Sequence, residues 1–347
     1  MSTNNKKILI IKLSSLGDVI FNVPLANALK DDGYEVSWLV SEKGLDIVNE
    51  NPSVDKVFLA PFDKWKKRKN KFQNIKEFFE LIKQIRAENY DIALDTQMRL
   101  KSLPFLRFCG AKRRIIAKDY KEFSNLGANE FIPAIKEGDK LNIVKCYLKF
   151  AKHLGINTNE IKITLPTSNQ ESIQAADELL KDIDKSKRLI IIAPATTWRG
   201  KHWNKENWTK LVRELEKDFT LIFTGTAKDN ALINEISQGK HLNLAGKTNL
   251  KTLIEILRRT DLLISLDSGT THLGWAAQNP KIVSIFCCTP SSLYAPTGSN
   301  KYIALQSEVC TPCHHKKCPL KDYRCTNSPS VDNVLKEVNN LLSERLL

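Results

Sequence analysis

Apolar and polar positions follow two different periods along the first half of the chain. The apolar runs at 7–13 and 91–95 are typical of buried strands, whereas apolar residues recur at helical spacing over 72–88. The same criteria predict strands at 35–40, 54–59 and 161–165, and helices at 18–29 and 141–154. Strands that alternate with helices in this way predict a parallel sheet with helices on both faces.

The second half of the chain begins the same alternation again. Leu189–Ala193 is an uninterrupted apolar run, as expected for a central parallel strand. Further strands are predicted at 219–224, 262–266 and 282–286, and helices at 171–180, 204–217, 227–237, 250–259, 271–277 and 331–347. We therefore expect an α/β protein with two Rossmann-like domains that face each other across a cleft, with ligands at the carboxyl ends of the strands.

Pro166 and the polar residues that follow it indicate where the first domain ends. The predicted N-terminal domain spans residues 1–168 and the predicted C-terminal domain spans residues 169–330. Residues 331–347 are expected to form a terminal helix that packs back toward the N-terminal domain. The chain has 347 residues, so each domain is long enough to bury its own core.

Basic residues exceed acidic ones by a wide margin, which gives a net charge of +14 and a pI of about 9.3. Such an excess implies an anionic partner: nucleic acid, anionic lipid or a phosphorylated substrate. No secretory signal and no run of ~20 apolar residues is visible, so we expect a soluble protein or one attached to a membrane surface. Eight cysteines then indicate reduced thiols or a metal site rather than a disulfide framework.

A polar loop, Lys12–Val19, directly follows the first predicted strand and precedes the first helix. A helix N-terminus presents unpaired N–H groups and partial positive charge, which would hold the carboxylate of Asp18 ionised and oriented. Gly17 allows close backbone approach. The alternative is that Asp18 only caps the helix.

The loop Pro194–Trp203 occupies the same kind of place after the first strand of the second domain. Its hydroxyls, cations and tryptophans suit a phosphate-bearing ligand, and Lys201 can neutralise phosphate as a point charge. A solvated basic loop packed by its tryptophans is the alternative.

A third strand-to-helix loop, Ser265–His272, is rich in small hydroxyl residues. Backbone N–H groups at the start of a helix form an anion site. His272 would lie on the first turn, where it either faces the cleft or serves as a packing residue.

Two further segments stand out by composition. Residues 64–71 hold six cations in eight residues, which indicates a solvated face, a mobile loop or a grip on a polyanion or an acidic lipid. Four cysteines within sixteen residues could bind zinc or iron, remain reduced thiols or form incidental disulfides. They are Cys310, Cys313, Cys318 and Cys325.

The three loops, together with the segment Asp95–Ser102, resemble the motifs of the ADP-heptose:lipopolysaccharide heptosyltransferases, and most closely those of heptosyltransferase I. That family consists of inverting glycosyltransferases with the GT-B fold, and the similarity runs from about Lys7 to Ser328. Met98 departs from the family pattern, which has glycine at this place. Cys287 and Cys288 stand where relatives often carry glycine and proline.

The resemblance implies a role for each group of residues. Asp18 matches the aspartate proposed as general base. The residues matched to the nucleotide sugar are Thr196, Thr197, Lys201, Asp229, Asp267, Ser268, Gly269 and His272. The residues matched to the acidic lipid-sugar acceptor are Lys64, Lys66, Lys67, Gln97 and Lys101. No cofactor is expected for the chemistry, and a structural zinc or iron ion is the role considered for the cysteines.

The resemblance therefore predicts heptose transfer from ADP-L-glycero-D-manno-heptose to a Kdo or heptose acceptor of the lipopolysaccharide inner core. It also predicts a monomer in the cytoplasm or at the cytoplasmic face of the inner membrane, with no nucleic-acid partner. The alternatives are a GT-B enzyme or epimerase that uses another nucleotide sugar, an autotransporter heptosyltransferase that modifies protein, a nucleic-acid-binding protein, and a nucleotide-sugar sensor. Walker A, GxGxxG, HExxH and nucleophile-elbow motifs are absent from the sequence.

Overall fold

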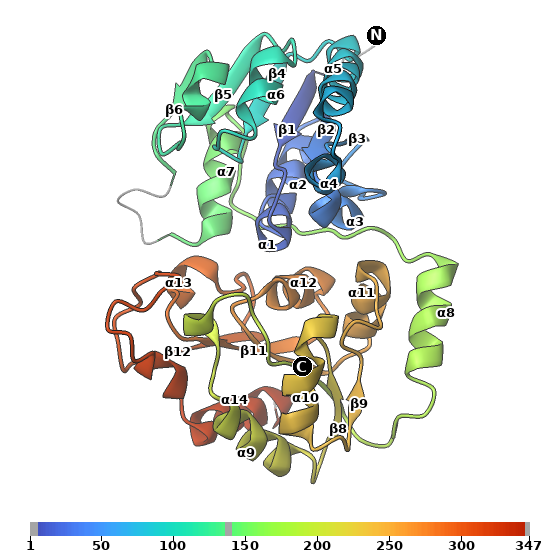
Figure 1. Cartoon of the computed structure of the whole chain (residues 1–347), viewed down its shortest axis with the longest axis vertical. Coiled ribbons are helices and arrows are strands. Elements are labelled where there is room, and N and C mark those ends of the chain that lie inside the picture. The colour runs from blue at the N-terminus through green and yellow to red at the C-terminus, as the bar shows by residue number, and fades with distance from the viewer. Residues whose placement is uncertain (1–5, 136–140, 344–347) are drawn as a thin grey trace. The chain divides into compact units, whose positions relative to one another are not determined.

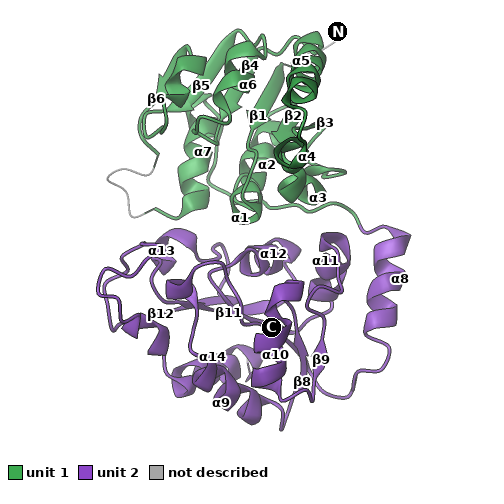
Figure 2. Cartoon of the chain, in the orientation of Figure 1, with its two compact units in different colours: residues 1–167 green, residues 168–347 purple. Residues whose placement is uncertain are grey.

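The structure is a computed structural model that describes residues 6–135 and 141–343. Its contacts divide the chain into two compact units, residues 1–167 and 168–347 (Figure 2). This division falls one residue before the predicted end of the first domain. Each unit consists of helices packed on a parallel sheet (Figure 1), so the predicted α/β class is confirmed.

Among the described residues, the first unit has six parallel strands in the order β3-β2-β1-β4-β5-β6. The strands are β1 (Lys7–Ile11), β2 (Glu35–Val40), β3 (Lys56–Leu59), β4 (Ile92–Asp95), β5 (Arg113–Ala117) and β6 (Glu130–Ile132). The helices are α1 (Leu16–Ile20), α2 (Val23–Asp31), α3 (Leu45–Val48), α4 (Phe62–Lys67), α5 (Lys71–Ala87), α6 (Leu103–Phe108) and α7 (Ile143–His153). Strand β1 is central because its apolar run is buried on both faces.

Residues 18–29, predicted as one helix, form two helices instead. Helix α1 ends at Ile20, and α2 begins at Val23 with Pro24 in its first turn. Proline has no backbone N–H and therefore fits the first turn of a helix better than its interior. The break leaves Asp18 on a short helix of its own, directly after β1.

Residues 161–165, predicted as a strand, form none. Ile163 and Leu165 are buried, while the Thr164 hydroxyl donates to Asn51 Oδ1 at 2.8 Å and the Asn27 amide donates to Thr164 Oγ1 at 3.2 Å. The alternating pattern therefore comes from extended chain packed beside α2, and not from a sheet.

The described part of the second unit also contains six parallel strands, in the order β12-β11-β10-β7-β8-β9. The strands are β7 (Leu189–Ala193), β8 (Thr220–Phe223), β9 (Leu242–Asn243), β10 (Leu262–Leu266), β11 (Lys281–Phe286) and β12 (Tyr302–Gln306). The helices are α8 (Gln170–Leu179), α9 (Lys205–Leu215), α10 (Asn230–Ser237), α11 (Leu250–Arg258), α12 (Gly269–Ala277), α13 (Ser291–Tyr294) and α14 (Val331–Ser343).

The terminal helix α14 belongs to the second unit, where it packs on α9 and β11. Its buried residues Val334, Val338 and Leu341 follow helical spacing and join the apolar core of that unit. This corrects the expectation that residues 331–347 pack back toward the N-terminal domain. Residues 344–347 lie outside the described residues.

Both sheets have the same connection order. With strands numbered along each unit, each sheet reads 3-2-1-4-5-6. In such sheets ligands bind at the carboxyl ends of the first and fourth strands, where the order of connections reverses. These strands are β1 and β4 in the first unit and β7 and β10 in the second. All four motif segments of the sequence start within one residue of these four strand ends.

Candidate functional site

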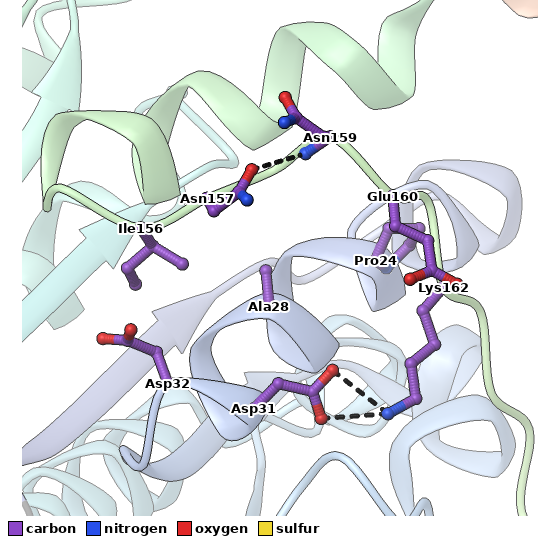
Figure 3. A pocket seen from close by; sticks show the side chains of 9 residues that line it. All are labelled: Pro24, Ala28, Asp31, Asp32, Ile156, Asn157, Asn159, Glu160 and Lys162. Carbon is purple, nitrogen blue, oxygen red and sulfur yellow. Dashed lines mark hydrogen bonds and ion pairs between the residues drawn. The ribbon is translucent and has the colours of Figure 1, made fainter.

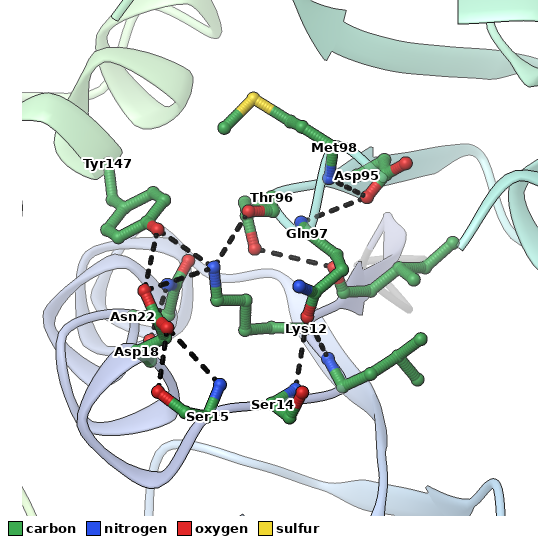
Figure 4. Close-up of polar contacts among 12 residues, drawn as sticks. Lys12, Ser14, Ser15, Asp18, Asn22, Asp95, Thr96, Gln97, Met98 and Tyr147 are labelled. Atoms are coloured by element: carbon green, nitrogen blue, oxygen red, sulfur yellow. Dashed lines mark hydrogen bonds and ion pairs between the residues drawn. The ribbon is translucent and has the colours of Figure 1, made fainter. Parts of the chain in front are cut away.

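In the first unit, hydrogen bonds connect the loop after β1 to the loop after β4. Gln97 Oε1 accepts hydrogen bonds from the backbone N–H groups of Leu13 and Ser14, both at 3.0 Å (Figure 4). Lys101 Nζ donates to Ser14 Oγ. Two residues that the sequence assigned to the acceptor, Gln97 and Lys101, are thus brought to the loop that carries Asp18.

The Asp18 carboxylate is held through both oxygens. Its Oδ2 accepts from the Ser15 hydroxyl at 2.8 Å and from the Ser15 N–H at 3.2 Å, which is a capping box at the start of α1. Its Oδ1 accepts from the Tyr147 hydroxyl at 3.3 Å and lies 3.7 Å from Lys12 Nζ. The side chain remains 38% exposed, so Asp18 caps the helix and still leaves part of its carboxylate accessible.

The buried ammonium of Lys12 joins three segments beneath Asp18. It donates to the Thr96 carbonyl oxygen at 3.0 Å and to the Tyr147 hydroxyl at 2.8 Å (Figure 4). Sequence reasoning gave no role to Lys12 or Tyr147. Lys12 stands inside the quoted motif, but no local signal marks Tyr147, which reaches the site from α7.

Asp95 ends β4 and is fully buried among neutral donors. It accepts from the N–H groups of Gln97 and Met98, each at 2.9 Å, and from the Ser102 hydroxyl at 2.8 Å. Burial outweighs these hydrogen bonds and raises the pKa of Asp95 to about 6. Met98 has a φ of 53°, in the left-handed region that favours glycine, which explains why the family pattern has glycine here.

The three lysines of the basic segment lie on α4. Lys64 Nζ pairs with Glu77 of α5 at 3.1 Å, and the Lys64 N–H donates to Glu42. Lys66 and Lys67 are exposed on the same helix. The described contacts of Lys64 thus run to α5 and Glu42, whereas those of Gln97 and Lys101 run to the Asp18 loop.

In the second unit, the loops after β7 and β10 meet at Asp267. The Thr196 hydroxyl donates to the Asp267 carbonyl oxygen at 3.0 Å. Lys201 Nζ lies 2.6 Å from Asp267 Oδ2, and His272 Nε2 lies 3.6 Å from Oδ1. Thr289, which sequence reasoning missed, donates to Oδ2 at 2.7 Å from the loop after β11.

These contacts make Asp267 the anchor of the loop cluster. Burial alone would raise the pKa of Asp267, but the hydrogen bond from His272 and the charge of Lys201 outweigh it and hold the pKa well below its usual range. The Lys201 ammonium also lies 4.7 Å from the centre of the Trp198 ring, so one tryptophan of the loop fixes this cation. His272 is buried beside the carboxylate rather than exposed on the first turn.

Helix α12 begins directly after this cluster. In the described contacts, the N-cap residue Ser268 makes no capping hydrogen bond with its side chain. The N–H groups of the first turn, which starts at Gly269, are therefore available to an anion. Thr197 is exposed on the neighbouring loop after β7.

Asp229 follows β8 and is engaged in a local cap. Its Oδ2 accepts from the Thr226 N–H at 2.7 Å and from the Thr226 hydroxyl at 2.8 Å. The carboxylate is only partly buried, so a second contact to a ribose hydroxyl is compatible with this geometry.

A separate pocket lies in the first unit between α2 and residues 156–162, and an ion pair between Lys162 and Asp31 at 2.9 Å borders it (Figure 3). The residues that line it are Pro24, Ala28, Asp31, Asp32, Ile156, Asn157, Asn159, Glu160 and Lys162. None of the motif residues belongs to this lining. We therefore assign the candidate site to the strand-end loops and not to this pocket.

The eight cysteines were predicted in two groups of four, one in the core and one at a possible metal site. Cys109, Cys146, Cys287 and Cys288 are buried, as core residues should be. The described residues contain no group of three or more His, Cys, Asp or Glu side chains placed to hold a metal ion. Burial, together with the neighbouring thiols of Cys310, Cys318 and Cys313, raises the pKa of Cys325 to about 11. The structure thus gives the proposed metal site at residues 310–325 no support.

A search of the described helices finds none that is both long enough and apolar enough to span a membrane.

Comparisons with known proteins agree with the motifs. The model of glycosyltransferase family 9 (heptosyltransferase) matches residues 78–324. Lipopolysaccharide heptosyltransferase 1 of Campylobacter coli is 28% identical, over 97% of this chain and 99% of the relative.

Two solved structures extend the likeness to the fold. A glycosyl transferase family 9 protein of Veillonella parvula DSM 2008 superposes with a TM-score of 0.81 at 18% identity, and covers 99% of both chains. The E. coli heptosyltransferase WaaC with ADP gives a TM-score of 0.73 at 20% identity, over 96% of this chain and 99% of that one. The predicted GT-B fold is thereby confirmed. Since the family model matches well over half of its length, the chain is a glycosyltransferase and belongs to glycosyltransferase family 9, the heptosyltransferase family.

Proposed function

We propose that the protein is an inverting heptosyltransferase that moves heptose from ADP-L-glycero-D-manno-heptose to a Kdo or heptose acceptor of the lipopolysaccharide inner core. The observation that carries the proposal is the pair of charged groups found at the two strand-end sites. One holds a partly exposed carboxylate, Asp18, and the other holds a fixed cation, Lys201, beside the start of α12. The name of the Campylobacter coli relative supports the lipopolysaccharide acceptor.

In the proposed reaction the second unit binds the donor. The diphosphate accepts hydrogen bonds from the first-turn N–H groups of α12, and Lys201 and His272 balance its charge as it departs. Thr196 and Thr197 line the same loop, and Asp229 reaches the ribose. Asp267 does not touch the diphosphate, since its carboxylate would repel it. It holds Lys201 in position.

Asp18 acts as the general base on the acceptor. Its Oδ1 takes the proton of an acceptor hydroxyl while that oxygen bonds to the anomeric carbon of the donor. The bond from this carbon to the diphosphate breaks, and ADP leaves with the electron pair. A single displacement of this kind inverts the anomeric configuration, and a positioned base contributes typically ~10²–10⁴-fold.

The acceptor is assigned to the first unit. Gln97 and Lys101 lie at the Asp18 loop, and the cations of α4, Lys64, Lys66 and Lys67, provide further positive charge for an acidic lipid-linked sugar. A monomeric enzyme at the cytoplasmic face of the inner membrane remains our prediction.

The test is mass spectrometry of the products formed when ADP-heptose is offered with Kdo-lipid A, Kdo2-lipid A and a heptosylated core. We expect one added heptose on one of the three acceptors. Binding of ADP-heptose without a product on any of them would contradict the proposal. A larger thermal stabilisation by UDP than by ADP would instead favour a different nucleotide sugar.

A further inference from the structure

Helix α5 carries two apolar faces, and only one of them is buried in the first unit. Leu81, Ile82 and Ile85 pack into the core. Phe72, Ile75 and Phe79 remain 76%, 53% and 60% exposed. These three recur at spacings of three and four residues, so they form one stripe along the helix. Large aromatic side chains exposed together on one face mark an interaction surface.

The stripe lines a groove together with Lys76, Glu80 and Lys83. The segment to which these residues belong, 64–83, holds eight cations and two carboxylates, a net charge of +6. The cations are Lys64, Lys66, Lys67, Arg68, Lys69, Lys71, Lys76 and Lys83. An apolar stripe with a lysine-rich border is the pattern of a helix that lies in the surface of a membrane.

Glu77 fixes the geometry of this surface. It accepts hydrogen bonds from Lys64 Nζ at 3.1 Å, Trp65 Nε1 at 2.9 Å and Arg68 at 2.9 Å. These contacts hold α4 against the first turns of α5. The cations of α4 are thereby held on an ordered helix packed against α5, instead of on a mobile loop as the sequence also allowed, and the lysines directly beside the stripe are Lys76 and Lys83.

We propose that α4 and α5 together form a docking surface for a lipid bilayer that contains anionic phospholipids. Phe72, Ile75 and Phe79 enter the boundary between headgroups and acyl chains, and the lysines meet the phosphates. A second copy of this chain fits the surface poorly, because two lysine borders would face each other. The proposal rests on the proposed function in that the α4 lysines are also assigned there to the lipid-linked acceptor. Vesicles that contain no lipid A test the surface alone, so its failure is distinguishable from a failure of heptose transfer.

The experiment is flotation of the full chain with vesicles of phosphatidylcholine alone or with phosphatidylglycerol added. We expect binding only to the anionic vesicles, with a loss of affinity as salt rises. The double variant Phe72→Ser/Phe79→Ser should bind the anionic vesicles with roughly one tenth of the wild-type affinity or less. Lys76→Gln/Lys83→Gln should bind about fivefold more weakly for each cation removed.

The matched control is Phe123→Ser/Leu126→Ser, which removes two side chains of similar exposure elsewhere on the first unit. It should float with the anionic vesicles like the wild type. Circular dichroism and thermal midpoints must be unchanged for every variant compared. Equal flotation of wild type and Phe72→Ser/Phe79→Ser, or no flotation of the wild type, would overturn the proposal. A wild-type dimer that this double substitution dissociates would assign the stripe to a second copy.

Discussion

The two units place an aspartate at the same point of the same topology, yet these aspartates have opposite properties. Asp95 ends the fourth strand of the first sheet, and Asp267 directly follows the fourth strand of the second. Both are buried. The pKa of Asp95 is raised to about 6, mainly by burial among neutral donors, whereas Lys201 and His272 hold the pKa of Asp267 below its usual range.

The side chains and N–H groups that surround each aspartate, and not the shared fold, therefore decide the charge at each strand end. The neutral donors around Asp95 hold the loop that carries Gln97 in shape. Of the two carboxylates at this site, the exposed one is that of Asp18. In the second unit a cation is fixed by Asp267 next to a helix N-terminus, which suits a departing diphosphate. One unit is thus equipped to accept a proton and the other to hold an anion.

The largest effect is expected from Asp18→Asn. The amide cannot accept a proton as a carboxylate does, so kcat should fall by ~10²–10⁴-fold. Steady-state kinetics with a lipid-linked acceptor measures this change. A kcat within threefold of the wild-type value would show that Asp18 is not the general base. The contrast between the two units would then also be wrong.

Lys201→Met should destabilise the second unit by about 3 kcal/mol at neutral pH, because it leaves the buried charge of Asp267 with fewer partners. Urea denaturation measures the free energy of unfolding. The matched control is Lys205→Met, which removes an exposed ion pair with Glu235 and should cost about 0.5 kcal/mol or less. Equal losses in the two variants would show that Asp267 does not depend on Lys201.

The pH dependence of Asp95→Asn sharpens the comparison further. The pKa of Asp95 is raised from 3.8 to about 6, so the folded protein binds the extra proton between these values. The wild type should lose about 3 kcal/mol of unfolding free energy as pH rises through this window. In the Asp95→Asn variant the amide oxygen still accepts from the N–H groups of Gln97 and Met98, and no group titrates at this position. The variant should therefore have a higher unfolding free energy than the wild type above pH ~6. Parallel stability curves for both proteins would contradict the assignment.

The smallest effect is expected from Tyr147→Phe. It removes one hydrogen bond to Asp18 and one from Lys12, which should lower kcat about three- to tenfold while ADP binding stays unchanged. Tyr302→Phe on β12 is the matched control and should leave kcat unaltered. An equal loss in both variants would indicate a general effect of the substitution and not the positioning of Asp18.

The sequence predicted the centre of each sheet better than its edges. The bounds of β2, β7 and β10 agree with the predicted ones, and nearly every residue of these three strands is buried. Strands β5, β6, β9 and β12 were missed. Strand β9 has two residues and β6 has three, which is too short for a periodic pattern, and β12 is only half-buried.

The candidate sites show the same limit. The segments that begin at β1, β4, β7 and β10 were recognised because their residues are contiguous in the sequence. Tyr147 and Thr289 were not, since they reach Asp18 and Asp267 from 129 and 22 residues away. Such contacts depend on how the elements pack, which no local pattern records. The position of the basic run 64–71 likewise follows only from the contacts of Lys64 and Arg68 with Glu77 on α5.

The central claim is that proton acceptance and donor binding belong to different units. Calorimetric titration of ADP into wild type, Asp18→Asn and Lys201→Met tests it most directly. We predict that Asp18→Asn binds ADP within about twofold of the wild type, and that Lys201→Met binds at least about tenfold more weakly, since it loses a charge-assisted contact to phosphate. Loss of ADP binding in Asp18→Asn with full binding in Lys201→Met would contradict the account.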